Sequence, residues 1–261
     1  MTNTQTLVFV AVLGVIAGFA MMRGNICSVL AARQIVELNR FTRMKAFAYS
    51  IAWSVAVMLP LVWMQASDFK LYPHYDLSYV AAVAGVVYGT GAFVNGACVF
   101  GVCSRTVAGE LHFLFALPGI ALGAMLASDA GFGPPKAGPP PSMLLSPTAI
   151  SVAILLVAAA LALVSAFGIW RAYARPGMGA TALVTAQRWR SSLAMAVLGV
   201  SGALLFASGQ TWNFPVLLRQ IGNWFAGRPY TFSSSLLVGT AALYGGALIG
   251  VLTGGRFVWH W

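Results

Sequence analysis

Long runs without a charged residue are the feature of this sequence that most restricts its fold. No Asp, Glu, Lys or Arg lies between Lys45 and Asp68, and none lies between Asp76 and Arg105. About 20 consecutive apolar residues are enough for a helix to cross the hydrocarbon core of a bilayer. Because 59% of the residues are hydrophobic and only 8% are charged, a water-soluble fold would expose large apolar patches. We therefore predict an all-α polytopic membrane protein.

Seven apolar stretches are long enough to be membrane spans. They are Leu7–Ala32, Ala46–Ala66, Tyr79–Val102, Leu111–Ala127, Thr148–Trp170, Ser192–Pro215 and Phe232–Thr253. No basic side chain precedes the first stretch, so we expect it to be a span and not a cleaved signal peptide. Some stretches are long enough to contain a re-entrant break, and we expect about seven spans in total.

The net charge of +10 is concentrated in two loops. The basic residues after the first and fifth stretches are Arg33, Arg40, Arg43, Lys45, Arg171, Arg175, Arg188 and Arg190, and the acidic residues of the other loops are Asp68, Asp76 and Asp129. Cytoplasmic loops of membrane proteins are enriched in Lys and Arg. We therefore expect both basic loops to be cytoplasmic and the N-terminus to lie outside. The basic charge then serves orientation and contact with membrane lipid, and no nucleic acid is expected as a partner.

A run rich in proline and glycine divides the chain. It extends from Gly131 to Pro141, and proline lacks a backbone donor, so the run favours an extended connection outside the membrane. The expected division is a first membrane repeat at 1–128 with both cysteine motifs, a Pro/Gly-rich loop at 129–147, and a second, shortened membrane half at 148–261.

The second half echoes the first. Val12-Leu-Gly-Val15 recurs as Val197-Leu-Gly-Val200, a displacement of 185 residues (197 − 12 = 185). Four predicted spans precede the proline-rich run and one more precedes the echo, so the second copy enters the membrane from the opposite side. Repeats of opposite orientation are a common construction of transporters, whose sites lie near mid-membrane between the copies. We therefore predict an inverted repeat.

Two apolar stretches share a combination of residues that disfavours a continuous helix. These residues are Gly24, Asn25 and Cys27 in the first stretch and Asn95, Gly96, Cys98 and Gly101 in the third. Glycine weakens a helix by about 1 kcal/mol relative to alanine, and free backbone amides at membrane depth need protein or a water-lined cavity to satisfy them. We expect each stretch to contain a helix break whose amides and asparagine face a polar path. The alternative is that the glycines only allow helices to pack closely.

A thiol beside each break indicates the kind of ligand. Helix N-termini and free amides attract anions, and a thiol is a polarisable, weak hydrogen-bond donor. A path lined by both suits a soft anion, although a buried cysteine also serves simply as a small hydrophobe. The nearest charges are Arg23, Arg105 and Glu110. A pair of Arg105 with Glu110 would hold the second break in shape, and the alternative for Arg105 is a helix end from which it extends to the interface.

Catalytic, cofactor and metal chemistry have little support in the sequence. His74, His112 and His260 show no metal-ligand spacing with the cysteines. Cys98 and Cys103 are separated by four residues, unlike the two-residue spacing of a thioredoxin-type redox pair. We therefore expect no catalytic residue, no cofactor and no bound metal, and we assign Cys103 to the substrate path together with the residues of the two breaks.

Around these residues the chain resembles the YeeE/YedE sulphur-transport family of bacterial inner-membrane proteins. The first motif looks like Arg23-Gly-Asn-Ile-Cys27, and the second is similar to the family pattern Gly-x-Cys-x-x-Gly, here Gly96–Gly101, followed by Arg105 and Glu110. The match is most specific in the second motif and covers the first half of the chain. It implies a multi-pass protein of the bacterial inner membrane, and the N-terminus that the loop charges place outside is then periplasmic. It also implies uptake of thiosulfate by a relay of thiols, here Cys27 and Cys98, on loops that converge at the centre of an hourglass-shaped protein.

The second half departs from the family pattern. The family's thiosulfate carriers have a further cysteine near the C-terminal end, but no cysteine follows Cys103, and Trp212 stands at the repeat position of Cys27. The sequence ends soon after Thr253, so we expect a full fourth motif to be missing. The favoured function is transport of thiosulfate or a related sulfur-containing anion. The alternatives are a non-transporting membrane subunit of a sulfur-metabolism complex, bound to a partner protein or a second copy, and a membrane thiol oxidoreductase that uses Cys98 and Cys103.

Overall fold

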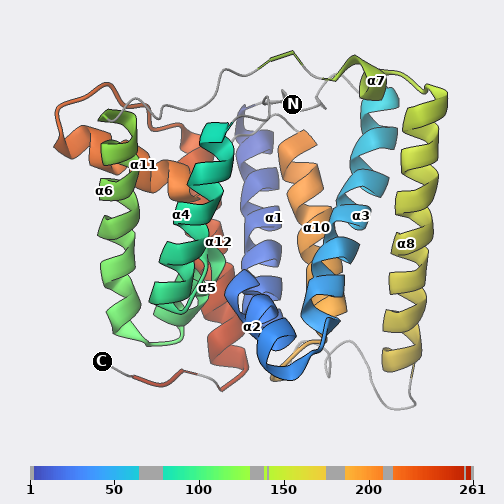
Figure 1. The fold of residues 1–261 in the computed structure, drawn as a ribbon, viewed down its shortest axis with the longest axis horizontal. Helices are drawn as coiled ribbons and strands as arrows, with labels where there is room; N and C mark the ends of the chain where they lie inside the picture. The colour runs from blue at the N-terminus through green and yellow to red at the C-terminus, as the bar shows by residue number, and fades with distance from the viewer. Residues whose placement is uncertain are drawn as a thin grey trace.

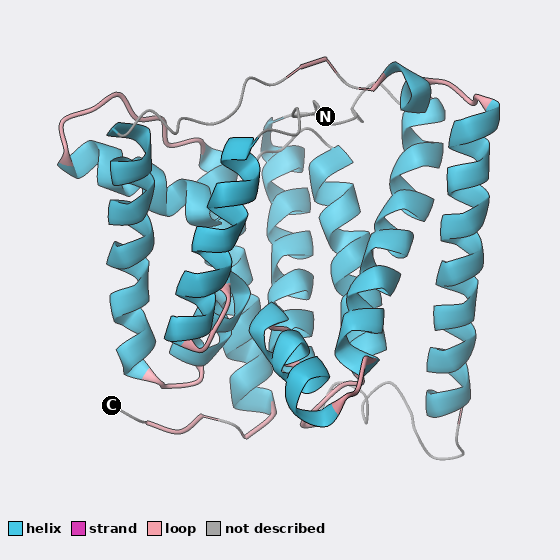
Figure 2. Cartoon of the chain, in the orientation of Figure 1, coloured by secondary structure: helices cyan, strands magenta, loops and turns pink. Residues whose placement is uncertain are grey.

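The computed structural model describes residues 3–64, 79–129, 138–139, 141–174, 186–207, 214–255 and 257–259. These residues form helices joined by loops, without a β-strand among them (Figure 2). The predicted all-α fold class is therefore confirmed. The expected extended run at 131–141 and the acidic loop residues Asp68 and Asp76 lie almost entirely outside the described residues.

The helices follow the chain as coloured in Figure 1. They are α1 (Asn3–Gly24), α2 (Ser28–Leu38), α3 (Thr42–Trp63), α4 (Tyr79–Asn95), α5 (Val99–Val107), the 3-10 helix η1 (Leu111–Phe115), α6 (Ala116–Asp129), α7 (Ser142–Leu145), α8 (Ala149–Tyr173), α10 (Ser191–Ala207), α11 (Phe214–Phe225) and α12 (Ser234–Thr253). Helix α7 is a single turn inside the segment 129–147 that we expected to be loop throughout.

Five helical stretches are long and apolar enough to cross a membrane. They are Thr4–Leu38, Thr42–Trp63, Tyr79–Val107, Ala149–Tyr173 and Ser234–Thr253. Two shorter apolar helices, Leu111–Ala127 and Ser191–Phe206, lie where the fourth and sixth spans were predicted. The protein is thus a polytopic membrane protein, while the total of seven spans stays a prediction.

Helix α11 differs from the expectation that Ser192–Pro215 forms one span. Helix α10 ends at Ala207, and Pro215 instead lies in the first turn of α11, where a proline is tolerated because no intrahelical donor is needed. Figure 1 shows α11 lying across the end of the bundle and not along it. Its sequence, FPVLLRQIGNWF, combines apolar residues with Arg219 and Gln220, and such amphipathic helices favour the membrane interface over its core.

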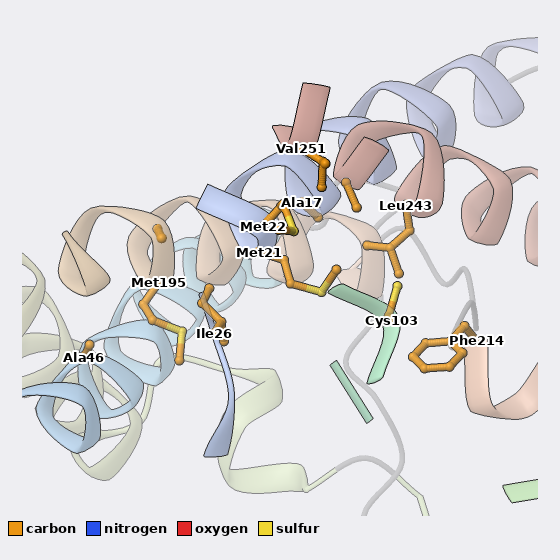
Figure 3. Close-up of a cluster of buried hydrophobic side chains, with 12 residues drawn as sticks. Ala17, Met21, Met22, Ile26, Ala46, Cys103, Met195, Phe214, Leu243 and Val251 are labelled. Atoms are coloured by element: carbon orange, nitrogen blue, oxygen red, sulfur yellow. The ribbon is translucent and has the colours of Figure 1, made fainter. Parts of the chain in front are cut away.

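The centre of the bundle consists of α1 packed on α12 and α10 packed on α3. A side chain at Gly18 would collide with the backbone of Leu243 in α12, and one at Gly246 would collide with the backbone of Val15 in α1. Glycine therefore allows these two helices to approach closely, as small residues commonly do in membranes. Figure 3 shows Met21 and Leu243 in the buried hydrophobic cluster that forms there.

The order of a long, a short and a long helix occurs twice, as α1–α2–α3 and as α10–α11–α12. Helix α1 begins at the end of the bundle that holds the N-terminus, whereas α10 begins at the opposite end (Figure 1). The repeat also relates the two central contacts. When each helix is replaced by its counterpart in the other set, the contact of α1 with α12 becomes the contact of α10 with α3. This arrangement supports the inverted repeat, and the domain boundaries at 128 and 148 stay predictions.

Several basic residues lie in segments that meet at one end of the bundle. The end of α2, the start of α3, the end of α8 and the start of α10 all lie there (Figure 1). Arg33, Arg43 and Arg190 belong to these segments. At the other end Asp129 closes α6 and pairs with Arg228 at 2.6 Å between Oδ1 and Nη2. We call the first end the basic end of the molecule.

Candidate functional site

The first predicted helix break is present. Helix α1 ends at Gly24, and Asn25 has a positive φ of 47° that interrupts the helix. Asparagine tolerates this left-handed conformation better than most residues. Cys27 then has extended backbone and stands immediately before α2. Gly24 also fills a packing role, because a side chain there would collide with Ala194 of α10.

The second predicted break is built in the same way. Helix α4 ends at Asn95, and Gly96 has a φ of 70°, a conformation that glycine adopts without strain. The side-chain amide of Asn95 donates to the carbonyl of Ala97 at 3.3 Å and so closes the turn. Cys98 has extended backbone and stands immediately before α5. The Asn-Gly pair therefore produces the interruption by its local conformation.

The two breaks meet at their cysteines. The backbone amide of Cys98 donates to Sγ of Cys27 at 3.4 Å, and the backbone amide of Ser28 donates to Sγ of Cys98 at 3.4 Å. Both thiols are buried, with 4% of each residue exposed. Each sulfur thus accepts a hydrogen bond from the N-terminus of the other helix. We call this contact of Cys27, Ser28 and Cys98 the thiol junction.

Gly101 allows the thiols to come together. A Cβ at this position would lie 2.9 Å from Sγ of Cys27 and 3.1 Å from Cβ of Ala97. Both distances are shorter than packed atoms normally allow, so a side chain here would displace the Cys27 thiol. Gly101 therefore contributes to the junction by leaving room for the Cys27 thiol and not by breaking a helix.

The junction combines two features that attract an anion. Helices α2 and α5 both begin there, and each N-terminus carries a partial positive charge together with backbone donors that have no intrahelical partner. The thiols add two polarisable groups that are weak hydrogen-bond donors. The surroundings are apolar, since Val29, Leu30 and Ala92 pack around the cysteines. Electrostatic attraction is stronger in such surroundings than in water.

Cavities of very different size flank the junction. One of about 760 Å³ lies among α4, α5 and α6, and its lining includes Tyr88, Asn95 and Val99. The other, of about 10 Å³, is lined by Cys27, Asn25 and Arg43 together with Ser191 at the start of α10. A volume of that size holds about one water molecule. The larger cavity thus lies beside the second break, on the side of α4–α6, and only a small hollow lies on the side of Arg43 and Ser191.

The side chain of Arg23 is buried, and its contacts are with residues outside the two breaks. It is 1% exposed, and it donates to the carbonyl of Ala186 at 2.6 Å and to the hydroxyl of Thr253 at 2.7 Å. Its guanidinium also lies 5.1 Å from the ring centre of Phe19. These contacts connect the ends of α1 and α12, so Arg23 stabilises the helix arrangement beside the break.

The predicted pair of Arg105 and Glu110 is confirmed. Nη1 of Arg105 lies 3.5 Å from Oε2 of Glu110, and the backbone amide of Glu110 donates to the carbonyl of Arg105 at 3.1 Å. The guanidinium also lies 5.1 Å from the ring centre of Phe113. The pair fastens the turn after α5 and not the break before it.

Replacing Glu110 with glutamine is expected to lower the free energy of unfolding by less than about 1 kcal/mol. The side chains of Arg105 and Glu110 are 34% and 32% exposed, and partly exposed ion pairs contribute little because water screens them. Thermal unfolding of the purified protein in detergent measures the change. A loss of several kcal/mol would contradict this assignment and place the pair among the main supports of the fold.

Cys103 lies apart from the other two cysteines. It is fully buried and packs with Met21, Phe214 and Leu243 in the central cluster (Figure 3). Cys98, five residues earlier, belongs to the separate cluster of Cys27. The two side chains therefore lie in separate clusters, and the structure does not bring Cys103 to the junction.

Arg43 also lies at the site, although the sequence analysis gave it only a role in membrane orientation. Its Nη1 donates to the carbonyl of Asn25 at 3.0 Å, and its backbone amide donates to the side chain of Gln34 at 3.1 Å. It lies in the first turn of α3, well after the break it contacts. No local pattern in the sequence distinguishes it from Arg40 or Lys45.

The fold and the junction together define a class: polytopic helical membrane proteins that present buried thiols at the N-termini of interrupted helices. The sequence model described as Sulphur transport matches residues 23–260. The chain therefore belongs to the sulphur-transport family, the YeeE/YedE family of the resemblance above. The match includes the second half, beyond the region where the motifs alone were specific. No curated protein matches the chain.

Membership in this family indicates that the protein transports a sulfur compound across a membrane. A sulfur anion as substrate and lipid as surroundings fit the helices and their composition.

Proposed function

We propose that this protein carries thiosulfate or a closely related sulfur-containing anion, and that Cys27 and Cys98 are the thiols that receive it. The observation that supports the proposal most strongly is the reciprocal hydrogen bonding at the thiol junction, where each sulfur accepts from the other helix N-terminus. Residues 71 positions apart meet at this point. Hydrophobic packing of two cysteines would not require their helices to begin at the same place.

The chemistry of the junction favours a soft anion. An anion that leaves water loses its hydration, and a buried charge is tolerated only where donors or opposite charge replace that hydration. Here the N-termini of α2 and α5 supply the dipoles and backbone donors. The thiols supply S–H donors to the terminal sulfur of thiosulfate. No covalent bond of the anion is made or broken in this transfer.

We take the direction of the proposed path from the two cavities. The anion arrives from the cavity among α4, α5 and α6, where Asn95 and Tyr88 are polar lining residues. It then contacts Cys98 and Cys27, whose thiols are within reach of the same ligand. The remaining hollow beside Cys27 is too small for the anion, so side chains on that side move to release it. We place the basic end in the cytoplasm of a bacterium, with the N-terminus in the periplasm.

A thiol oxidoreductase that uses Cys98 and Cys103 has less support. Cys98 contacts Cys27 and Ser28, whereas Cys103 packs with residues of α1 and α12. A disulfide requires two sulfur atoms at about 2 Å from each other. The arrangement of α5, with the two side chains in separate clusters, does not favour that bond.

Thiosulfate is expected to protect Cys27 from alkylation. With thiosulfate at ten times its dissociation constant, about one site in ten stays free, so the labelling rate by N-ethylmaleimide should fall about tenfold. Trypsin releases Cys27 in the peptide Gly24–Arg33, which contains no other cysteine. Mass spectrometry of this peptide from the purified full-length protein therefore reports labelling at Cys27 alone.

Sulfate at the same concentration and ionic strength is the matched control, because it has the same charge without the soft terminal sulfur. We expect it to leave the rate at Cys27 unchanged. Equal labelling with and without thiosulfate would contradict the proposed substrate. Equal protection by both anions would contradict the role given to the sulfur of thiosulfate.

A further inference from the structure

We infer that Arg43 forms a binding position for the transported anion on the basic side of the thiol junction. The inference rests on the proposed function, and it adds a residue that neither cysteine motif includes. Arg43 lines the small hollow beside Cys27, together with Asn25 and Ser191. The hollow lies where the path leaves the junction toward the basic end.

The break itself holds the guanidinium in place. Nη1 of Arg43 donates to the carbonyl of Asn25 at 3.0 Å, and Asn25 is the residue whose positive φ turns the chain away from α1. On the other side, the side chain of Gln34 in α2 accepts from the backbone amide of Arg43 at 3.1 Å. Arg43 is half-buried, so its position is set by α2 and by the break and not by solvent alone.

The charge of Arg43 has no carboxylate beside it in the described part of the chain. The acidic residue of α2, Glu37, pairs with Arg33 at 3.4 Å. A guanidinium has five N–H donors in a planar fork, and one hydrogen bond to Asn25 leaves donors for a further acceptor. Arginine matches anions with paired oxygen atoms particularly well.

Ser191 strengthens the assignment. Helix α10 begins at this residue, and Ser191 lines the same hollow. The partial positive charge of a helix N-terminus adds to the full charge of the guanidinium. An anion that has left the thiols therefore meets a positive potential in its direction of travel, and the hydration it lost is replaced there before it reaches water.

Reaction of Cys27 with a charged thiol reagent tests this position without any use of thiosulfate. The purified full-length protein in mild detergent is treated with a methanethiosulfonate that carries a sulfonate, and separately with a neutral hydroxyl analogue of similar size. The peptide Gly24–Arg33 reports both rates. Because a nearby positive charge attracts only the anionic reagent, Arg43→Gln is expected to lower the ratio of anionic to neutral rate at least about fivefold. Arg43→Lys should largely retain the ratio of the unmodified protein.

Arg40→Gln is the matched control. Arg40 belongs to the same loop but is exposed and does not line the hollow, so its removal should leave the ratio nearly unchanged. An unchanged ratio in Arg43→Gln would overturn the inference. So would an equal change of both rates, which would indicate a deformed break, or an equal effect of Arg40→Gln, which would indicate general surface charge. A lowered ratio without protection by thiosulfate would instead retain the anion position and refute the proposed substrate.

Discussion

Cells that carry the Cys98→Ala variant are expected to take up thiosulfate at least about tenfold more slowly than cells with the unmodified protein. The Cys98 thiol is 4% exposed and lies at the N-terminus of α5. Without it, the anion must pass the buried junction with one of its compensating groups missing. A hydrogen bond to a charged group contributes about 1.5–3 kcal/mol, and each 1.4 kcal/mol corresponds to about a tenfold change in rate.

Radiolabelled thiosulfate uptake, in cells without other uptake systems, measures the effect. Two control variants define its origin. Cys98→Ser keeps a hydrogen-bond donor at this position and loses only the polarisable sulfur, so we expect its uptake to lie between that of Cys98→Ala and that of the unmodified protein. Cys103→Ala changes a buried cysteine of the same helix that packs in the central cluster, and we expect it to retain most of the uptake. Unchanged uptake in Cys98→Ala would refute the role of the thiol junction.

Replacing Gly101 with alanine is expected to reduce thiosulfate uptake at least about tenfold, although the residue itself carries no functional group. The added methyl group would lie 2.9 Å from Sγ of Cys27 and 3.1 Å from Cβ of Ala97. Overpacking of this kind costs about 1–3 kcal/mol. The thiol of Cys27 can relieve the collision only by leaving its contact with the amide of Cys98, and the junction would then open.

The same substitution at Gly85 is the matched control. Gly85 lies within α4, and a Cβ there meets no atom within 4 Å among the described residues. Since alanine favours a helix over glycine by about 1 kcal/mol, Gly85→Ala should preserve both uptake and stability. The labelling rate at Cys27 gives a second measurement, because a displaced thiol reacts at a changed rate in Gly101→Ala. Normal uptake and normal labelling in that variant would refute the packing role of Gly101.

Much of the fold could be predicted from local features of the sequence. The charge-free stretches predict membrane helices because hydrocarbon tolerates few charges. Asn25 and Asn95-Gly96 predict the breaks because these residue types accept a positive φ. The pair of Arg105 and Glu110 also follows from short separation along the chain. Helix α11 was missed because its apolar residues merge with the preceding span in a one-dimensional pattern.

The functional assembly depends on contacts that sequence separation conceals. A single sequence shows that Cys27 and Cys98 both follow a break, but their contact depends on how α1, α4 and their neighbours pack. The role of Gly101 as space for a thiol, and the approach of Arg43 to Asn25, likewise follow from packing.

The sequence by itself therefore determined the membrane environment, the positions of the breaks and the identity of the groups beside them. Backbone propensity and hydrophobicity act over a few neighbouring residues, and they are legible in the order of the amino acids. Only the tertiary structure decided which groups share a site, separated Cys103 from Cys98 and turned Arg23 toward α12. Those outcomes depend on the close packing of helices distant in the chain, which no local pattern encodes.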